Sequence, residues 1–425
     1  MGTFGWFFFI LGPCLVLYGD EKGLSPVEIS LHMSAMSFAA ALGGLVIPML
    51  ARKFGRGLTM RIAAFTFILA IVTLVIANSL AISIIACFIV GIASTGVVSM
   101  ITSFLDQEHD QFSTAAITEA NTFGAVGGIF GPLFVGFAVS SGLGWRSGMI
   151  AAAVAFILLE IFRGSLEAFN VQKENGETQT SGKLSKNYWW AWALLITTAG
   201  PELMVMLWSA KLLQIQGGLD TGASVAAISS LTIGYIISRT ISSYLSRTMS
   251  NEFLLKIAFA IPLVAFWLFW ISTNGFVMLI ALGICGLGLG MHWPLAIGRA
   301  IQAGFNNPDK ASAVAAYATG GSGIVLPVAL GAISQTVGLK NAFLLVPAVL
   351  LVGLVMLFLH PLEKNKSIKK WNLRQNNCRK HSEQNQQSYS TTKFWSHNAI
   401  LTHKKTACRI ICRQFYFKLI TQAIE

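Results

Sequence analysis

The sequence predicts an all-α integral membrane protein with twelve transmembrane helices, arranged as two six-helix bundles. Hydrophobic residues make up 54% of the 425-residue chain and charged residues only 11%, whereas soluble proteins are about 25% charged. Apolar stretches of about 20 residues, the length that crosses a bilayer core of about 30 Å, recur along the chain. One long polar stretch divides these into two sets of six. Each must be a helix, because lipid cannot satisfy free backbone N–H and C=O groups.

The order of apolar and polar stretches predicts the domain organisation. The first apolar stretch is short and has no basic segment before it, so we interpret it as a membrane helix and not as a cleaved signal peptide. The polar stretch is rich in Gly, Ser, Thr, Lys and Glu, which is typical of a solvated linker. The expected domains are a first bundle at 1–163, a linker at 164–187, a second bundle at 188–362 and a basic tail at 363–425. The apolar stretches lie at about 3–19, 27–50, 58–78, 80–104, 113–140, 145–163, 188–212, 222–245, 253–273, 276–297, 311–337 and 341–360.

The two sets of six are related by a shift of 195 residues, which indicates an internal repeat. Two separated stretches share this one shift, so chance similarity is a poor explanation. Paired six-helix halves that hold a substrate between them are a transporter architecture, and the repeat predicts a pseudo-two-fold axis. The matched positions are Leu50/Leu245, Arg52/Arg247, Arg61/Lys256, Ile62/Ile257, Gly128/Gly323, Pro132/Pro327 and Gly136/Gly331.

The distribution of basic residues predicts the orientation in the membrane. The net charge of +12 comes mostly from the tail after Leu362, so it does not indicate a nucleic-acid partner. With the N-terminus inside, the cytoplasmic side holds Arg52, Lys53, Arg56, Arg61, Arg163, Lys173, Lys183, Lys186, Arg247, Lys256, Arg299 and Lys310. The outer side holds Lys22, Arg146, Lys211 and Lys340. The positive-inside rule then places both termini in the cytoplasm of a multi-pass protein of the plasma or inner membrane.

Neither catalysis nor a metal site is predicted. The six cysteines show no spacing typical of a metal site or of a disulfide framework. The acidic stretch from Asp106 to Asp110 has no second cluster with it, so we interpret it as a solvated loop. The tail is either a basic segment on anionic lipid, with Cys408 or Cys412 as lipidation candidates, or a disordered extension, or sequence appended by a wrong reading frame. No cofactor is expected.

The loop between the second and third spans, PMLARKFGRG from Pro48 to Gly57, resembles the signature loop of the major facilitator superfamily. The family pattern is Gly-x-Leu-Ala-Asp-Arg-x-Gly-Arg-Arg/Lys, and its matches here are Leu50, Ala51, Lys53, Gly55 and Arg56. The chain departs from the pattern at Pro48, Arg52 and Gly57. A short turn needs Gly55, and the cations favour the anionic membrane face. The loop is either a gating element or a topology anchor, and Arg52 replaces the acid with which the family builds its gating salt bridge.

The fifth span carries a second motif, GAVGGIFGPLFVG. Gly127, Gly131, Pro132 and Gly136 resemble the family's fifth-helix pattern, Gly-x-x-x-Gly-Pro-x-x-Gly-Gly, which the family links to antiporters. Small residues four apart let two helices approach closely, so helix packing alone is the other interpretation. The resemblance covers residues 1 to about 360 and implies transport by alternating access.

The eighth span carries an arginine within an apolar segment. Thr232, Tyr235, Arg239, Ser242 and Ser246 follow one another at intervals of 3, 4, 3 and 4, so they share one side of a helix. A charge at a helix centre costs about 2.5–3.5 kcal/mol even on insertion scales, so it faces a cavity or a partner. Arg239 is therefore either a substrate or coupling residue, or part of a structural ion pair.

Two acids are candidates for coupling transport to protons. Glu202 lies near the middle of the seventh span, next to Pro201, and is the expected partner of Arg239. Glu119 lies on the fifth span with Asn121 nearby. It is either a proton carrier, a helix-start acid at the interface, or part of an interhelical hydrogen bond. A carboxyl group taken out of water favours its neutral form, which a proton carrier requires.

The tenth span, GLGLGMHWPLAIGR, combines alternating glycines with Pro294 and His292. Pro294 removes the helical hydrogen bond to the Gly290 carbonyl and weakens the helix there. His292 is a candidate coupling group because imidazole titrates near physiological pH. Trp293 and Trp208 are candidates for stacking on a solute, although lipid-facing packing is the commoner role of a membrane tryptophan.

The sequence therefore predicts a monomeric secondary transporter of a small organic solute, with protons and the lipid bilayer as the other partners. Two alternatives remain: an uncoupled facilitator, and a receptor-like protein that has kept the fold without transport. Uptake separates the last from the others, because a receptor binds its solute without accumulating it.

Overall fold

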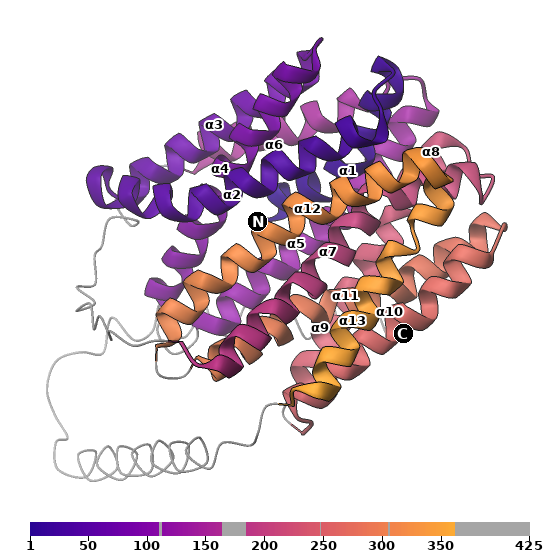
Figure 1. The fold of residues 1–425 in the computed structure, drawn as a ribbon. Helices are drawn as coiled ribbons and strands as arrows, with labels where there is room; N and C mark the ends of the chain where they lie inside the picture. The colour runs from indigo at the N-terminus through magenta and orange to yellow at the C-terminus, as the bar shows by residue number, and fades with distance from the viewer. Residues whose placement is uncertain (110–112, 164–183, 247, 305–306, 362–425) are drawn as a thin grey trace, which may run out of the picture. The chain divides into compact units, whose positions relative to one another are not determined.

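The computed structural model describes residues 1–109, 113–163, 184–246, 248–304 and 307–361, and its regular secondary structure there is helical (Figure 1). The proposed tail at 363–425 and most of the proposed linker, 164–183, lie outside the described residues. The helices are α1 (Gly2–Lys22), α2 (Pro26–Phe54), α3 (Arg56–Ile76), α4 (Leu80–His109), α5 (Ser113–Ser140), α6 (Arg146–Phe162), α7 (Lys186–Ile215), α8 (Thr221–Ala226), α9 (Ile228–Leu245), α10 (Asn251–Ile271), α11 (Gly275–Ala303), α12 (Pro308–Ala342) and α13 (Leu345–Leu359).

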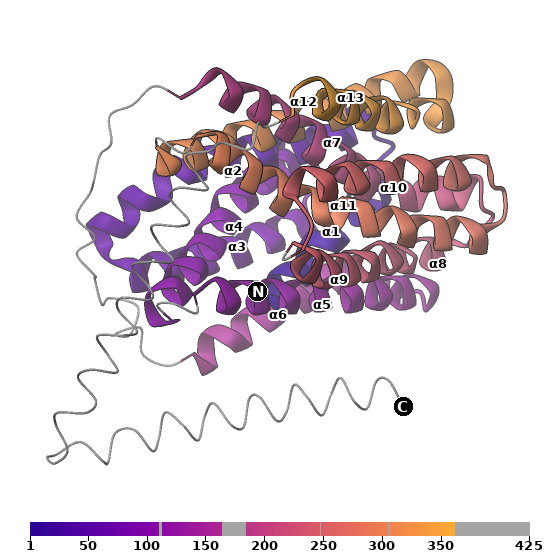
Figure 2. The same ribbon diagram turned by 90° about the horizontal axis from the view of Figure 1, so that it is seen from below.

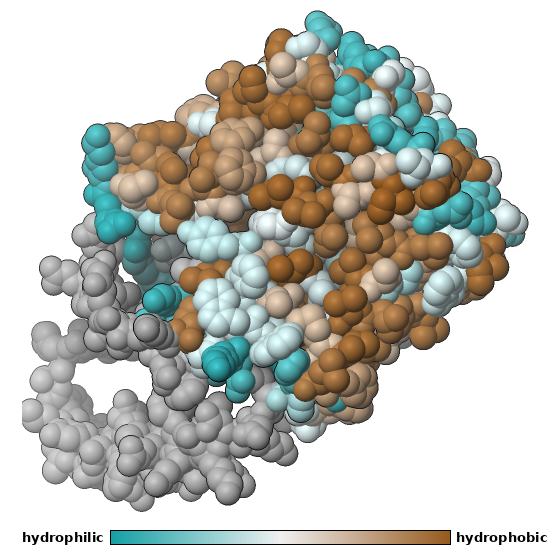
Figure 3. Space-filling view, in the orientation of Figure 1, coloured by the Kyte–Doolittle hydropathy of each residue, from teal (hydrophilic) through white to brown (hydrophobic). Residues whose placement is uncertain are grey.

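Ten helical segments in the described part are long and apolar enough to cross a membrane, with α8 and α9 counted as one segment. The sixth and twelfth predicted spans contain helices too, but α6 has 17 residues and α13 has 15, against the roughly 20 that a full crossing needs. Figure 3 shows apolar residues across the middle of one face and hydrophilic residues gathered towards its ends. The chain is thus a multi-pass membrane protein, and the twelve-crossing arrangement stays a prediction.

Short polar residues begin many of the helices. Ser25 caps α2 in a capping box, in which its hydroxyl accepts from the Glu28 N–H while the Glu28 carboxylate accepts from the Ser25 N–H. Asp220 begins α8 in the same way by accepting from the Ala223 N–H. These caps satisfy backbone donors that would otherwise be free, so the chain can reverse in few residues.

The turn from α2 to α3 depends on Gly55. Its φ of 80° lies in the region that only glycine adopts without strain, and α3 begins at the next residue. This confirms the prediction that the signature loop needs a glycine at this position. The turns at the two ends of these helices define two sides of the body, called the Gly55 end and the Gly23 end. The Gly55 end holds this turn, and the Gly23 end holds the turn from α1 to α2, where Gly23 has a φ of 65°.

Glycines of α5 let it pack against two different helices. A Cβ at Gly127 would overlap the Gly2 carbonyl oxygen, and one at Gly131 would lie 2.9 Å from the Trp6 carbonyl oxygen, both on α1. Gly136 faces α8 instead, where a Cβ would lie 2.5 Å from the Gly222 carbonyl oxygen. The motif therefore packs helices closely, as its small residues predict; its link to antiport is not addressed by these contacts.

Helices from the two sequence halves meet at two places. Helix α12 packs along α2, and α5 packs along both α8 and α9 (Figures 1 and 2). At the first place the Ser34 hydroxyl of α2 donates to the Ile324 carbonyl of α12 at 2.6 Å. At the second the Ser229 hydroxyl of α9 donates to the Ile129 carbonyl of α5 at 2.7 Å. Both donors and both acceptors are 195 residues apart, so the shift found in the sequence is also present in the contacts.

The two halves are closely packed at the Gly23 end. A Cβ at Gly331 of α12 would lie 2.6 Å from the Pro26 carbonyl oxygen of α2, which corresponds to the approach of Gly136 to α8. The Lys211 ammonium of α7 lies 2.6 Å from the Asp20 carboxylate of α1 and adds an ion pair between the halves. The halves are therefore held together at this end by backbone proximity and by opposite charge.

Candidate functional site

Helices α7, α9 and α11 meet inside the membrane body, and their meeting point carries polar groups. The glycines of α11 permit the approach, because a Cβ at Gly290 would lie 2.7 Å from the Tyr235 Cα of α9. Gly288, on another side of α11, faces Pro262 and the Ala258 carbonyl of α10. The alternating glycines of the tenth span are thus needed by two different neighbours of α11.

Arg239 lies at this junction and is anchored through part of its guanidinium. Its Nε is 3.5 Å from the Gly290 carbonyl oxygen, and its guanidinium carbon lies 5.8 Å from the centre of the Tyr235 ring. Gly290 is four residues before Pro294, which has no N–H, so the helix leaves this carbonyl without its usual donor. Arg239 supplies a donor there and interacts with an aromatic face at the same time.

Glu202 of α7 completes the cluster. Its carboxylate lies close enough to Arg239 and to the Tyr235 hydroxyl to interact with both. It forms no ion pair within 4 Å with Arg239, which has no carboxylate that close among the described residues. The Tyr235 side chain is fully buried, and its hydroxyl has no hydrogen-bond partner in the described part of the chain. The cluster therefore holds a carboxyl, a phenol and a guanidinium that are close but not locked together.

The polar stripe of α9, formed by Thr232, Tyr235, Arg239 and Ser242, faces protein over most of its length. Thr232, Tyr235 and Ser242 are buried, while Ile237 and Ile241 on the opposite side are 44% and 48% exposed. The polar residues therefore share one side of α9, as their spacing predicts. Its serine and threonine hydroxyls are used within α9 itself, since Ser242 donates to the Arg239 carbonyl at 3.2 Å and Thr232 to the Ile228 carbonyl at 3.3 Å.

We expect a cysteine at position 239 to react with a membrane-impermeant, water-soluble thiol reagent and a cysteine at position 237 to remain unreactive. Arg239 is partly exposed on the side of α9 that faces other helices, whereas the exposed Ile237 faces the apolar surroundings of the body. The measurement is the labelling rate of Arg239→Cys and Ile237→Cys in membranes, with the native cysteines replaced by serine. Equal labelling of the two would show that the stripe does not border water.

His292 is occupied by a neighbouring helix. Its Nε2 is 3.0 Å from the Ala258 carbonyl oxygen of α10, and its ring packs 4.4 Å from the ring centre of Phe259. Ala258 lies four residues before Pro262, so this carbonyl also lacks its helical donor. Because a carbonyl can only accept, His292 carries a proton on Nε2. It donates to a carbonyl of α10 that lacks its helical donor, as Arg239 does to a carbonyl of α11.

The structure does not bring the remaining sequence-derived candidates into the cluster. Glu119 and Asn121 are exposed on α5, and Trp293 is 49% exposed on α11. Trp208 is buried on α7, and its indole nitrogen has no hydrogen-bond partner among the described residues. Trp208 is thus the one of the two tryptophans with an unused donor inside the protein.

The signature-loop cations lie at the Gly55 end. Arg52 and Lys53 are exposed, and Lys53 lies 5.2 Å from the ring centre of Phe54. Leu50 is packed against the hydrophobic core. One terminal nitrogen of Arg56 is buried without a hydrogen-bond partner among the described residues. With Arg52 in place of an acid, the loop shows no ion pair within 4 Å to another described residue.

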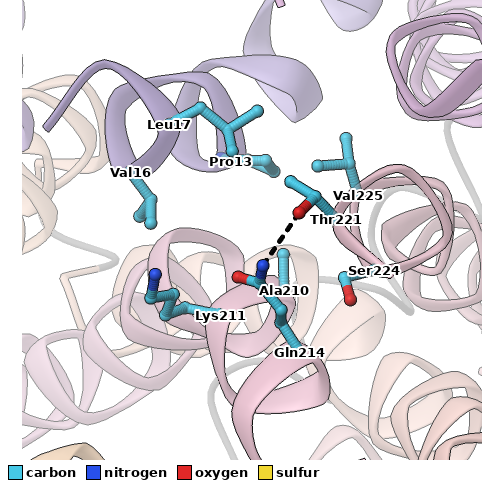
Figure 4. Close-up of a pocket in the computed structure, with 9 residues that line it drawn as sticks. All are labelled: Pro13, Val16, Leu17, Ala210, Lys211, Gln214, Thr221, Ser224 and Val225. Carbon is cyan, nitrogen blue, oxygen red and sulfur yellow. Dashed lines mark hydrogen bonds between the residues drawn. The ribbon is translucent and has the colours of Figure 1, made fainter. Parts of the chain in front are cut away.

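A small pocket lies at the Gly23 end between α1, α7 and α8 (Figure 4). Apolar groups of Pro13 and Val225 line it together with the polar side chains of Lys211 and Gln214. The Gln214 amide donates to the Thr221 hydroxyl at 2.8 Å, and Lys211 is paired with Asp20. The polar groups of Lys211 and Gln214 are therefore already engaged within the protein.

Sequence reasoning missed the two serine contacts between the halves. Ser34 and Ser229 match at the same shift of 195 residues as the glycines, and so do Ile129 and Ile324. The repeat pairs these positions, but only the structure shows that each serine donates across the halves. Single serines in an apolar helix attract little attention, because they usually donate within their own helix.

Comparisons with known proteins agree with this architecture. The sequence model described as "Major Facilitator Superfamily" matches residues 1–322. Among solved structures, the chain resembles a bacterial homolog to the human lysosomal transporter Spinster in an inward-facing and occupied conformation, with a TM-score of 0.67 and 14% identity over 84% of this chain and 94% of that one. The inward-facing and unoccupied form of that homolog gives a TM-score of 0.67 and 13% identity over the same shares. No match was found among curated proteins. The chain belongs to the Major Facilitator Superfamily of membrane transporters.

Proposed function

We propose that the protein is a proton-coupled secondary transporter that moves a small organic solute across the cell membrane by alternating access. One observation carries this proposal: Glu202, Tyr235 and Arg239 meet where α7, α9 and α11 join, inside an otherwise apolar body. Ionisable groups inside a membrane protein are costly and mark substrate or proton pathways.

The proton would be carried by Glu202. Its carboxyl group has no ion pair within 4 Å among the described residues, so a charge on it is only partly compensated. Taking up a proton removes that cost. The nearby hydroxyl of Tyr235 and guanidinium of Arg239 both respond to the change, because they lose an anionic neighbour. Proton uptake and solute binding can thus be linked at a single place.

The contacts support a transporter that opens towards the Gly55 end. The Gly23 end is closed by the Asp20–Lys211 ion pair and by the approach of Gly136 and Gly331 to their neighbours. Basic residues gather at the Gly55 end, which the positive-inside rule places in the cytoplasm together with both termini. Two six-helix bundles that rock about the contacts of α2 with α12 and of α5 with α8 and α9 would expose the cluster to each side in turn.

The test is uptake by proteoliposomes that contain the purified protein. An inward-directed proton gradient should drive accumulation of a solute identified by ligand-induced thermal stabilisation, and a protonophore should abolish the accumulation. Equal accumulation with and without the gradient would identify an uncoupled facilitator. Binding without entry of the solute would identify the receptor-like alternative, which the Arg52 substitution in the signature loop also favours.

A further inference from the structure

The charges of the cluster indicate the charge of the solute, if the protein has the proposed function. Arg239 is the cation of the cluster, and the ion pairs found in the described part lie elsewhere, towards the ends of the helices: Glu21–Lys22, Glu21–Arg146, Glu160–Arg163, Asp20–Lys211 and Glu252–Arg299. The cluster therefore contains one positive charge, balanced at a distance by Glu202.

The guanidinium of Arg239 is only partly engaged. Its Nε is held at the Gly290 carbonyl, while its two terminal nitrogens have no hydrogen-bond partner among the described residues and are not enclosed. The neighbouring serines do not compete for them, because Ser238 donates to the Tyr235 carbonyl at 3.0 Å and Ser242 to the Arg239 carbonyl. These two nitrogens form a planar fork of N–H donors, which matches the two oxygens of a carboxylate.

Tyr235 provides a second donor beside the fork. Its side chain is fully buried and its hydroxyl has no hydrogen-bond partner in the described residues, which is a costly state for a phenol inside a protein. Phe9 of α1 packs edge-on to the Tyr235 ring at 5.8 Å between ring centres and holds the ring in place. When Glu202 takes up a proton, the hydroxyl loses this anionic neighbour and can donate to a bound acceptor instead.

Charge balance then decides the class of solute. When Glu202 takes up a proton, the positive charge of Arg239 loses its counter-charge in a medium where an unpaired charge is expensive. A bound monoanion restores neutrality, whereas a neutral or cationic solute does not. A phosphate ester would bring up to two negative charges to a single arginine. We propose that the solute is a small organic carboxylate, bound by Arg239 and Tyr235 as Glu202 takes up one proton.

The test uses compound pairs that differ only in the group expected to be recognised. Purified full-length protein is screened for thermal stabilisation by monocarboxylates and by their carboxamides, with benzoate and benzamide, nicotinate and nicotinamide, and lactate and lactamide as the first pairs. Hits should occur among the carboxylates alone. Arg239→Gln should weaken the binding of each hit by at least about tenfold, the equivalent of about 1.4 kcal/mol.

A matched control removes a positive charge elsewhere. Lys256→Gln takes away a cation that lies over the Phe358 ring near the Gly55 end, and it should leave carboxylate binding unchanged. Arg239→Lys keeps the charge without the fork, so its affinity should fall between those of the wild type and Arg239→Gln. The inference is overturned if amides bind as well as acids, if no carboxylate binds, or if Arg239→Gln retains full affinity.

Proton uptake on binding separates this inference from the proposed function. Calorimetry of a carboxylate hit in two buffers of different ionisation enthalpy should show proton uptake by the wild type and none by Glu202→Gln. Proton-driven transport of a neutral or cationic solute would overturn the carboxylate assignment and leave the proposed function standing. A carboxylate that binds through Arg239 but never crosses the membrane would support the carboxylate assignment and overturn the proposed function.

Discussion

Replacing Glu202 with glutamine is expected to abolish accumulation driven by a proton gradient while leaving exchange of solute intact. Glutamine keeps the shape of the side chain and its capacity for hydrogen bonds, but it cannot bind and release a proton. In the wild type, a gradient of one pH unit can sustain about tenfold accumulation per coupled proton. In Glu202→Gln the internal concentration should rise no higher than the external one, which is measured as uptake into proteoliposomes with and without the gradient.

Glu119→Gln is the matched comparison, because it makes the same chemical change at an exposed position of α5. We expect it to keep proton-driven accumulation. Accumulation that survives in Glu202→Gln and disappears in Glu119→Gln would transfer the coupling role to α5. Survival in both variants would leave the proposal of coupling through a carboxyl group without support.

Removing both hydroxyls that join the halves is expected to open the Gly23 end. Ser34→Ala and Ser229→Ala each delete one hydrogen bond between the halves. Each bond contributes about 1 kcal/mol, so the double variant should shift the balance between closed and open by about 30-fold and each single variant by about fivefold. The measurement is the labelling rate of Gln214→Cys, a residue of the pocket between α1, α7 and α8.

Ser141→Ala is the control for this pair. Ser141 is exposed near the same end, directly after α5, and its hydroxyl donates to the Phe137 carbonyl of α5 at 2.8 Å. It should leave the labelling rate of position 214 unchanged. A double variant that labels no faster than the wild type would show that the two bonds are equally strong in both conformations, and the serines would then have no part in closing this end.

Much of the fold could be predicted from the sequence because the signals are local. The length of an apolar stretch locates a membrane helix. Gly55 marks a turn and the Ser25 capping box marks the start of α2, and each of these signals involves only a few residues. The shift of 195 residues predicted that the halves are related, and the matching hydrogen bonds of Ser34 and Ser229 show the same shift. Helices α7 and α10 begin two residues before the predicted spans. Ser185 and Ser250 cap them among the polar residues that precede each apolar stretch.

The site was predicted less completely because its formation depends on which helices meet. Helical spacing placed Tyr235 and Arg239 on one side of α9, and mid-span position singled out Glu202. The same reasoning kept Glu119 as a second candidate, since both are acids inside apolar stretches, and only the packing shows that Glu119 is exposed. Nor could it show that His292 donates to the Ala258 carbonyl, a contact set by the approach of α10 to α11.

The twin serine bonds have the form of an isologous contact. When two identical subunits associate about a two-fold axis, residue i of one touches residue j of the other, and j of the first touches i of the second. Ser34 with Ile324 and Ser229 with Ile129 satisfy this rule within one polypeptide, once 195 is subtracted from the higher numbers. These two contacts between the halves therefore have the symmetry of a homodimer interface. A substitution in either contact changes only one of the two halves. The halves can therefore diverge in sequence while they keep the geometry of their association.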